Sequence, residues 1–299
     1  MGLTVILVTG GTGFVGSHLV PQLVETGDKI RCLVRSPAKA KTLQRYGVEL
    51  VLGDVTRLQI LEQAMRGVET VIHLVAIIRE SKDATFDRIN AQGTTNVLQA
   101  AMESGVKRFI HMSALGASPS PKYRYTYSKW QGEEAVRSIN LGFAIFRPSV
   151  IFGQGSGFIT QLIRSLMMSP FLAPVPGSGK TRFQPIWVED VATCIVRELK
   201  DGKTGQTYEI GGPEHLTYEQ ILDTVIRVLE IKRTKVHIPL ALMRPAVMAM
   251  EKTMQNPPVT LAELAQLEVD NTTGVNSVEH LFGFKPFALS QGLDYIKSP

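Results

Sequence analysis

The sequence predicts an α/β protein in which a doubly wound parallel Rossmann sheet is followed by a small C-terminal α/β lobe. Apolar segments alternate with helical patterns through residues 4–147, and Gly10, Gly13 and Gly16 follow the first apolar segment directly. Strands rich in Val, Ile and Leu that alternate with helices form parallel sheets covered on both faces. Right-handed crossovers then place a ligand at the carboxyl ends of the strands.

The expected elements of the first half follow from this alternation. Strands are expected over residues 4–9, 29–34, 48–53, 70–75, 107–112 and 142–147. Helices are expected near residues 14–26, 37–46, 57–66, 85–104 and 125–139. Each strand therefore connects to the next through one helix, as a parallel sheet requires.

The pattern changes after Phe152, where loops rich in Gly and Pro appear. The later elements expected are a strand end and helix over 183–199, a strand over 206–210, a helix near 217–230, a strand near 235–238 and a Met-rich helix near 240–255. We therefore predict a Rossmann domain over residues 1–152, to which 183–212 returns. Residues 153–182 and 213–299 form the predicted small lobe.

Composition narrows the class of function. The 299 residues carry a net charge of +5, with 44% apolar and 20% charged residues. Because Lys and Arg are scattered, the charge suits anionic small ligands and does not indicate nucleic acid. Cys32 and Cys194 lie in apolar runs and read as buried thiols of a reducing, cytoplasmic or stromal-type compartment. Met1 leads directly into the first strand, so no targeting peptide is expected, and no run has transmembrane length.

The glycine motif predicts a cofactor site. A buried strand, a tight turn and a helix start are what a dinucleotide diphosphate needs, because glycines admit the phosphates and the helix N-terminus supplies N–H donors. The alternative is an ordinary glycine-rich turn. The residues expected to contact the diphosphate are Thr9, Gly10, Thr12, Gly13, Phe14, Val15 and Gly16.

The end of the second strand favours NADP(H) over NAD(H). An NAD site carries an acidic residue there, whereas this strand ends in Arg35 and Ser36. An arginine can hold a 2′-phosphate through two hydrogen bonds, although a solvent-exposed surface arginine is the alternative. Asp54 and Val55 end the third strand, where the carboxylate could accept from the adenine amino group or cap a helix.

A Tyr-x-x-x-Lys pattern predicts the catalytic pair. Tyr125 and Lys129 stand four residues apart, so they share one face of a helix. A lysine ammonium beside a phenol lowers the phenol pKa, and the tyrosine can then exchange a proton with a carbonyl or alcohol during hydride transfer.

Together these motifs resemble the short-chain dehydrogenase/reductase superfamily, in its extended or atypical, NAD-dependent epimerase/dehydratase-like branch. The resemblance covers nearly the whole chain. It extends to N-x-x-G-T-x-N-V-L at 90–98, and it assigns Leu74, Val75 and Ala76 to the cofactor site. It also assigns Pro148, Ser149 and Val150 to the border of the nicotinamide, and Lys129 to the nicotinamide ribose.

A narrower group is similar over more segments. These are H-M-S-A-L-G-A at 111–117, T-R-F-Q-P-I-W-V-E-D-V-A at 181–192, Y-E-I-G-G-P-E at 208–214 and N-P-P-V-T at 256–260. The group contains bacterial and plastid relatives of the NADPH-binding accessory subunit of respiratory complex I. The resemblance implies tight NADP(H) binding and a redox membrane complex as a partner, without one agreed reaction.

One departure concerns the catalytic hydroxyl. Extended enzymes read S-S-x-x-V-Y-G after the fifth strand, and the later hydroxyl polarises the substrate carbonyl. Here Ala114 takes that position, and Ser113 stands one residue early. Because a shift of one residue at a strand end turns the side chain elsewhere, Ser113 is a doubtful catalytic residue.

The remaining polar residues have simpler interpretations. His73 and His111 lie on buried strands as core histidines, and no cluster has the spacing of a metal site. Arg79 and Arg182 are candidates to contact a polar substrate group, or are exposed. The Met-rich helix near 240–255 is interpreted as core or pocket lining, with a lipid-facing or partner-facing surface as the alternative.

Two functions remain open at this point. One is an NADP(H)-dependent oxidoreductase that acts on a small carbonyl or alcohol, such as a quinone-related or isoprenoid-like compound. Tyr125 and Lys129 favour it. The other is a non-catalytic, NADP(H)-loaded subunit or assembly factor, peripheral to a redox membrane complex. Ala114 and the narrower group favour that second reading.

Overall fold

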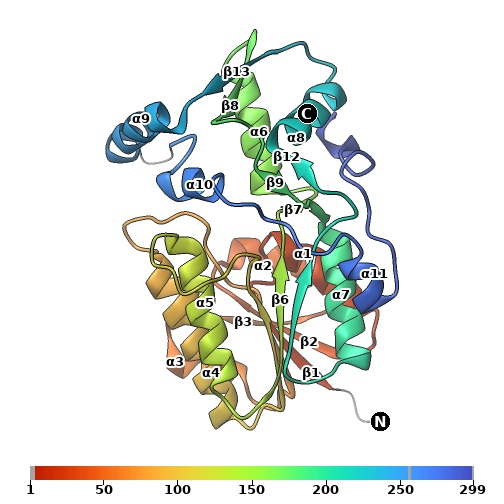
Figure 1. Ribbon diagram of the computed structural model, residues 1–299. Coiled ribbons are helices and arrows are strands. Elements are labelled where there is room, and N and C mark those ends of the chain that lie inside the picture. The colour runs from red at the N-terminus through yellow and green to blue at the C-terminus, as the bar shows by residue number, and fades with distance from the viewer. Residues whose placement is uncertain (1–3, 255–256, 298–299) are drawn as a thin grey trace. The chain divides into compact units, whose positions relative to one another are not determined.

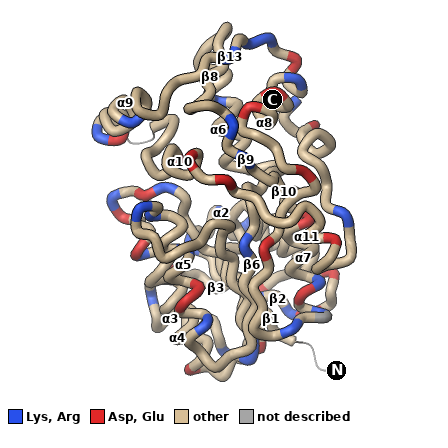
Figure 2. The backbone as a smooth tube through the Cα atoms, viewed as in Figure 1, with Lys and Arg blue, Asp and Glu red and all other residues tan. Residues whose placement is uncertain are grey.

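The computed structural model describes residues 4–254 and 257–297. Contacts between Cα atoms divide the chain into two compact units, each built from two segments (Figure 1). The first unit comprises Met1–Pro148 and Val191–Glu209, and the second comprises Ser149–Asp190 and Ile210–Pro299. Lys and Arg are dispersed among acidic residues along the chain (Figure 2).

A seven-stranded sheet of order β11-β6-β5-β4-β1-β2-β3 forms the centre of the first unit. The strands are β1 (Val5–Thr9), β2 (Lys29–Val34), β3 (Glu49–Leu52), β4 (Thr70–His73), β5 (Arg108–Met112), β6 (Gly142–Pro148) and β11 (Gln206–Ile210). Strands β1 to β6 pair in parallel. The predicted fold class is confirmed, and the strand order reverses direction at β1, where doubly wound sheets bind their ligands.

Helices cover both faces of this sheet. One face carries α1 (Phe14–Val24), α2 (Pro37–Gln44) and α7 (Val188–Asp201). The other carries α3 (Leu58–Ala64), a π-helical turn η1 (Asp87–Gln92) that continues into α4 (Gly93–Glu103), and α5 (Arg124–Arg137) (Figure 1). Because both faces are covered, Ile6, Leu7 and Val8 of β1 are each at most 2% exposed.

The second unit has short strands and several helices. Its elements are β7 (Ile151–Phe152), α6 (Gly157–Met167), β8 (Leu172–Pro176), β9 (Arg182–Phe183), β10 (Ile186–Trp187), β12 (Leu216–Thr217), α8 (Tyr218–Val228), β13 (Thr234–Ile238), α9 (Leu240–Thr253), α10 (Leu261–Gln266), α11 (Ser277–Phe282) and η2 (Asp294–Ile296). Its strands form pairs, β10 with β7, β12 with β9 and β13 with β8. Apolar side chains of α6, β8 and α8 build its core.

Helix α9 differs from the expectation for the Met-rich segment. Val247 is the buried residue among its fourteen, so the helix does not line a core as expected. Leu242 and Met248 are exposed, and Leu240, Met243 and Met250 are half-buried. Across residues 4–254 and 257–297, no helix combines the length and apolar content needed to cross a bilayer.

Candidate cofactor and catalytic site

The glycine motif folds into the turn between β1 and α1. Gly10 adopts φ of +83°, which favours glycine, and its carbonyl accepts from the Gly13 amide at 2.9 Å. A Cβ on Gly16 would overlap the Gly10 carbonyl oxygen, so α1 can approach the turn only with glycine there. Gly13 is exposed, and a Cβ there meets only the Gly10 oxygen, at 3.1 Å. A larger side chain at 13 would therefore extend over the open end of the helix.

The N-terminus of α1 suits an anion. Its N-cap is Gly13, which makes no side-chain capping bond, and the first turn holds no acidic residue. The first-turn N–H groups, together with the helix dipole, therefore point toward a place for a diphosphate. Thr12, Phe14 and Val15 are half-buried around it. These residues fit a dinucleotide diphosphate.

Arg35 and Asp54 lie together at the ends of β2 and β3. The Arg35 side chain is exposed, and its Nε is 3.9 Å from Asp54 Oδ2. The other Asp54 oxygen accepts from the Thr56 amide at 2.9 Å, which fixes the carboxylate in a turn. Ser36 is the N-cap of α2, whose first turn also lacks an acidic residue. An exposed guanidinium beside such a helix start can receive a 2′-phosphate.

The segment after β4 lies against the glycine turn. The Leu74 amide donates to the Thr9 carbonyl at 3.0 Å. A Cβ on Gly10 would lie 3.1 Å from the backbone of Leu74 and Val75. Ala76 is exposed, and Val55, which follows β3, is buried. The ends of β1 and β4 assigned to the cofactor therefore lie in contact.

Asn90, which the sequence analysis did not single out, fixes the segment after β4. Its Oδ1 accepts from the Ile77 amide at 2.8 Å, and its Nδ2 donates to the Ile77 carbonyl at 3.0 Å. Nδ2 also lies 3.0 Å from the Ser128 hydroxyl of α5. The buried amide therefore ties the cofactor-side segment to the helix that carries Tyr125 and Lys129. The quoted N-x-x-G-T motif contained the signal that could have identified it.

Lys129 lies almost wholly inside the protein. It is 1% exposed, and its Nζ donates to the Met112 carbonyl at 2.6 Å. Burial lowers the pKa of Lys129 to about 8, while the charge of Glu133 acts in the opposite direction. Because an ammonium has three N–H donors, two remain for ligand hydroxyls.

Tyr125 lies one turn earlier on α5, and its pKa contradicts the expectation. Its ring meets Phe86 edge-on, with centroids 5.8 Å apart. Burial raises the pKa of Tyr125 to about 12. Lysine was expected to lower this pKa, but the structure bonds the Lys129 ammonium to Met112, and desolvation of the phenol dominates.

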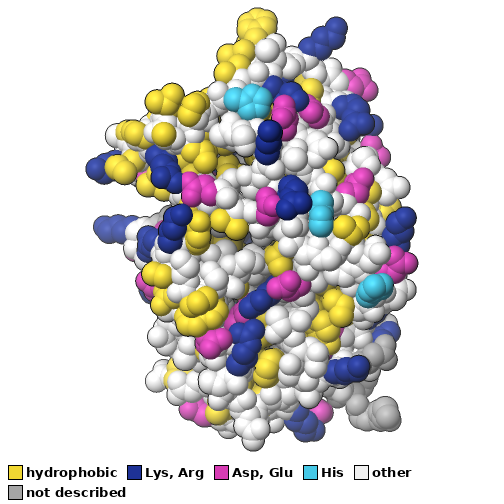
Figure 3. Space-filling view, viewed as in Figure 1, with side chains coloured by type: hydrophobic (Ala, Val, Ile, Leu, Met, Phe, Trp, Pro, Cys, Tyr) yellow, Lys and Arg dark blue, Asp and Glu magenta, His cyan; other side chains and the backbone are white. Residues whose placement is uncertain are grey.

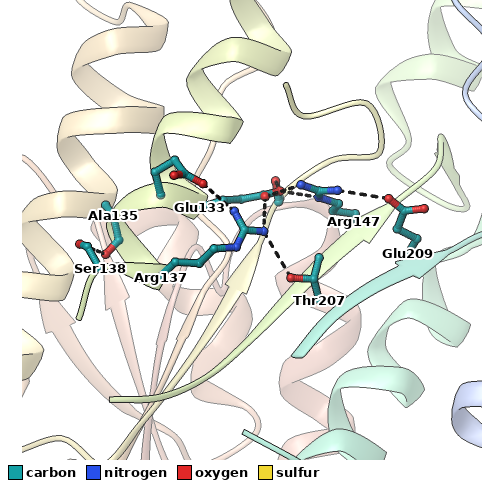
Figure 4. Close-up of polar contacts among 9 residues, drawn as sticks. Glu133, Ala135, Arg137, Ser138, Arg147, Thr207 and Glu209 are labelled. Atoms are coloured by element: carbon teal, nitrogen blue, oxygen red, sulfur yellow. Dashed lines mark hydrogen bonds and ion pairs between the residues drawn. The ribbon is translucent and has the colours of Figure 1, made fainter. Parts of the chain in front are cut away.

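Ser113 donates its hydroxyl to a carboxylate. The Ser113 Oγ donates to Glu133 Oε1 at 2.5 Å. Glu133 also accepts from Arg147 Nε at 2.8 Å and from Arg137 Nη2 at 2.8 Å (Figure 4). Burial raises the pKa of Glu133, but the hydrogen bonds from Arg147, Ser113 and Arg137 outweigh it and leave the pKa below its usual value. The group links β5, β6 and α5, and Arg147 extends it to Glu209 of β11.

Two buried histidines lie under the site. The Thr9 hydroxyl is 2.7 Å from His73 Nδ1, and Thr94 is 3.1 Å from its Nε2. His73 stacks on His111 with ring centroids 5.6 Å apart. Burial, with Lys129 acting in the same direction, lowers the pKa of His73 to about 3 and that of His111 well below its usual value. Both rings are therefore neutral. His73 is a hydrogen-bonded core histidine as expected, whereas the two ring nitrogens of the buried His111 have no hydrogen-bond partner among the described residues.

The other sequence candidates fall in both units. Pro148 accepts from the Leu115 amide in the first unit, and Arg79 is half-buried there. In the second unit, Ser149 Oγ lies 2.7 Å from Asn271 Oδ1, and the Val150 carbonyl accepts from Ile186. Arg182 Nη2 pairs with Asp270 at 2.7 Å, so its charge already has a partner. Within the described residues, no group of His, Cys, Asp or Glu could hold a metal ion.

The fold and the glycine turn define a Rossmann-type dinucleotide-binding protein. The model of the NAD dependent epimerase/dehydratase family matches residues 6–211, and the chain belongs to this family. A nicotinamide dinucleotide is therefore the class of cofactor that the turn serves.

Individual relatives differ in what they are named for. The chain is 34% identical to a ceramide reductase of Caulobacter vibrioides over 64% of the chain and 60% of that protein. It is 32% identical to subunit 9 of the NADH dehydrogenase [ubiquinone] 1 alpha subcomplex, mitochondrial, of Arabidopsis thaliana, over 73% of the chain and 56% of that protein. The chain thus spans less than two thirds of both. The solved structure of gox2253 superposes with a TM-score of 0.78 at 25% identity, covering 98% of each chain.

Proposed function

We propose that this chain is an NADP(H)-dependent oxidoreductase that interconverts a small carbonyl compound and its alcohol. The observation that carries the proposal is that the glycine turn and Lys129 both lie at the carboxyl ends of the neighbouring strands β1, β4 and β5. The glycine turn follows β1 and lies on the segment after β4, and Lys129 binds the carbonyl of Met112, the last residue of β5. Asn90 connects the two places.

Each side chain has a role in this proposal. NADP(H), when bound, supplies or accepts the hydride. The first-turn amides of α1 hold the diphosphate, and Arg35 holds the 2′-phosphate. Lys129 uses its remaining N–H donors to hold the nicotinamide ribose hydroxyls. Tyr125 exchanges a proton with the substrate oxygen.

The titration of the two groups favours the reductive direction. A phenol with a pKa near 12 is protonated at neutral pH, so Tyr125 carries the proton that a carbonyl oxygen must receive, and the raised pKa makes it a weaker acid than an ordinary tyrosine. Lys129, with a pKa near 8, loses its charge as the pH rises through that value. Cofactor affinity should then fall above about pH 8. The ceramide reductase relative supports an apolar substrate. The quinone-related or isoprenoid-like kind is our hypothesis for this chain.

Replacement of Tyr125 tests the proposal. We expect Tyr125→Phe to keep NADPH affinity and to lose turnover, because only the transferred proton is removed. Lys129→Ala should lose both. The matched control is Tyr127→Phe on the same helix, where the ring stacks on Trp130. The assays use NADPH titration and oxidation rates with a panel of quinones, aldehydes and ketones. Full turnover in Tyr125→Phe contradicts the assignment.

A second function is favoured by the contacts of Ser113 and Tyr125. The Ser113 hydroxyl donates to Glu133, so it is not directed at a substrate carbonyl. The raised pKa of Tyr125 makes it a weaker proton donor to the substrate oxygen. The Arabidopsis relative is named as a complex I subunit. A non-catalytic, NADP(H)-loaded subunit or assembly factor fits these observations. Protein that retains NADP(H) through purification yet shows no turnover in the panel supports this alternative and opposes the first.

A further inference from the structure

The second unit exposes an apolar tip where two strands begin. Strands β8 and β13 are parallel, with Thr234 opposite Leu172, and the Thr234 amide donates to the Phe171 carbonyl at 2.8 Å. Helix α6 ends at Met167 immediately before this edge. The apolar tip, as named here, consists of Met167, Met168, Phe171 and Leu172.

All four side chains of the apolar tip face solvent. Phe171 is 76% exposed, Met168 71%, Met167 53% and Leu172 45%. Only Ser169 and Pro170 interrupt them in the sequence. Figure 3 shows hydrophobic side chains gathered at this end of β8 and β13, with basic side chains nearby. Exposed apolar side chains that cluster on one projection mark an interaction site.

Three cations surround the base of the apolar tip. Arg164 is exposed one turn before the end of α6, and Lys232 and Arg233 immediately precede β13. Arg233 Nε donates to the Leu166 carbonyl at 3.3 Å, which keeps it at the base. Among residues 4–254 and 257–297, no acidic side chain pairs with these three cations.

Two acidic side chains of the neighbouring helix α8 are already paired. Glu219 and Asp223 both bind Lys235, at 2.7 and 3.0 Å. Glu230 is exposed two residues before Lys232, so three cations and this one carboxylate lie near the base of the apolar tip. The net result at the tip is an apolar projection with an excess of positive charge around its base. This is the arrangement of a peripheral membrane contact, in which apolar groups enter the interface and cations meet anionic headgroups.

We propose that the apolar tip inserts into the surface of an anionic lipid bilayer, with Arg164, Lys232 and Arg233 against the headgroup phosphates. A bilayer fits better than a second copy of this chain. A symmetric dimer through the tip brings the same patch of both copies together, and so sets like charges against each other. The proposal is independent of the reaction at the nucleotide site.

Vesicle sedimentation of the full chain tests the proposal. We expect binding to phosphatidylcholine vesicles that contain about 30% phosphatidylserine, weaker binding to pure phosphatidylcholine, and a decrease with added salt. The double variant Met168→Ser with Phe171→Ser should bind about tenfold more weakly, because it removes the inserting area. Arg164→Gln with Lys232→Gln should lose the preference for anionic vesicles.

Matched control variants distinguish vesicle binding by the apolar tip from non-specific binding by other parts of the surface. Met102→Ser removes a 49% exposed methionine from the first unit, and Lys203→Gln removes an exposed charge there. Both should bind vesicles as the wild type does. A separate readout is Phe171→Trp, whose fluorescence brominated lipids should quench above the background of Trp130 and Trp187.

Three results overturn the proposal. One is a wild-type chain that does not bind anionic vesicles. Another is binding that the control substitutions weaken as much as the tip substitutions do. The third is a wild-type dimer, seen by analytical ultracentrifugation, that the Met168→Ser and Phe171→Ser variant converts to a monomer, which assigns the tip to a second copy. Circular dichroism of each variant establishes that it is folded.

Discussion

At the scale of single residues, contacts decide what a motif can do. The sequence places Tyr125 and Lys129 on one helix face, and this follows from their spacing alone. It does not reveal that Lys129 donates to Met112 or that burial raises the Tyr125 pKa, because both depend on the atoms packed around them. Glu133 stands four residues after Lys129, and two of its partners, Ser113 and Arg147, come from segments distant in the sequence.

Arg35 is expected to select the cofactor. Arg35→Ala should weaken NADPH binding roughly ten- to a hundredfold, the value of a charged hydrogen-bonded contact, and should leave NADH binding nearly unchanged. Isothermal titration of both cofactors measures this. Arg45→Ala, an exposed arginine beyond the end of α2, is the control. Equal affinity of the wild type for NADH and NADPH contradicts the expectation.

Ser113 is expected to matter for stability more than for turnover. Ser113→Ala removes a donor to the buried Glu133 carboxylate, which costs about 1–3 kcal/mol of unfolding free energy. The rate with a reducible carbonyl should change little, because the hydroxyl faces Glu133. Urea unfolding and steady-state kinetics measure the two effects. A large loss of turnover with unchanged stability means that Ser113 contacts the substrate.

At the scale of elements, long helices and strands could be predicted from the sequence, and very short ones could not. The parallel strands and helices of the first unit have long apolar periods, so their order could be predicted. Two-residue strands such as β7, β9, β10 and β12 are too short to show a period. The helix expected over residues 85–104 begins with the π-helical turn Asp87–Gln92, which places Asn90 against Ile77. Hydrophobic periodicity carries no signal for such a turn.

Two substitutions in the turn between β1 and α1 should affect different properties, one the folding of the first unit and the other cofactor binding. Gly16→Ala places a Cβ onto the Gly10 carbonyl oxygen, so we expect loss of the folded first unit. A Gly13→Leu side chain meets only the Gly10 oxygen, at 3.1 Å, which a small backbone shift can relieve, so the variant should stay folded while losing NADP(H) binding. Thermal unfolding and cofactor titration distinguish the two. Unchanged NADPH affinity in Gly13→Leu removes the nucleotide assignment.

At the scale of the whole molecule, acid should destabilise the fold through its buried histidines. His73 has a folded-state pKa near 3, below the usual 6.5, so the unfolded chain binds this proton first. Stability from His73 is therefore complete above about pH 6.5 and falls toward pH 3, at about 1.4 kcal/mol per pH unit. The lowered pKa of His111 acts in the same direction.

Urea unfolding across this pH range checks the expectation. His111→Leu should make the loss of stability with falling pH shallower than in the wild type, because one fewer proton is taken up on unfolding. The exposed His280→Gln is the control and should keep the wild-type slope. A wild-type free energy of unfolding that does not change between pH 6.5 and 4 is incompatible with neutral buried rings.

The position of β11 in the chain has a consequence for synthesis. This edge strand pairs with β6, yet residues 149–205 lie between the two. At a synthesis rate of about 5–20 residues per second, the ribosome needs roughly 3–11 seconds to synthesise these residues, and β6 lacks its partner strand β11 during that time. During that interval the nascent sheet presents unpaired backbone groups to other chains. Slow translation of this stretch should increase aggregation of the newly made protein, and chaperones that bind nascent chains should reduce it.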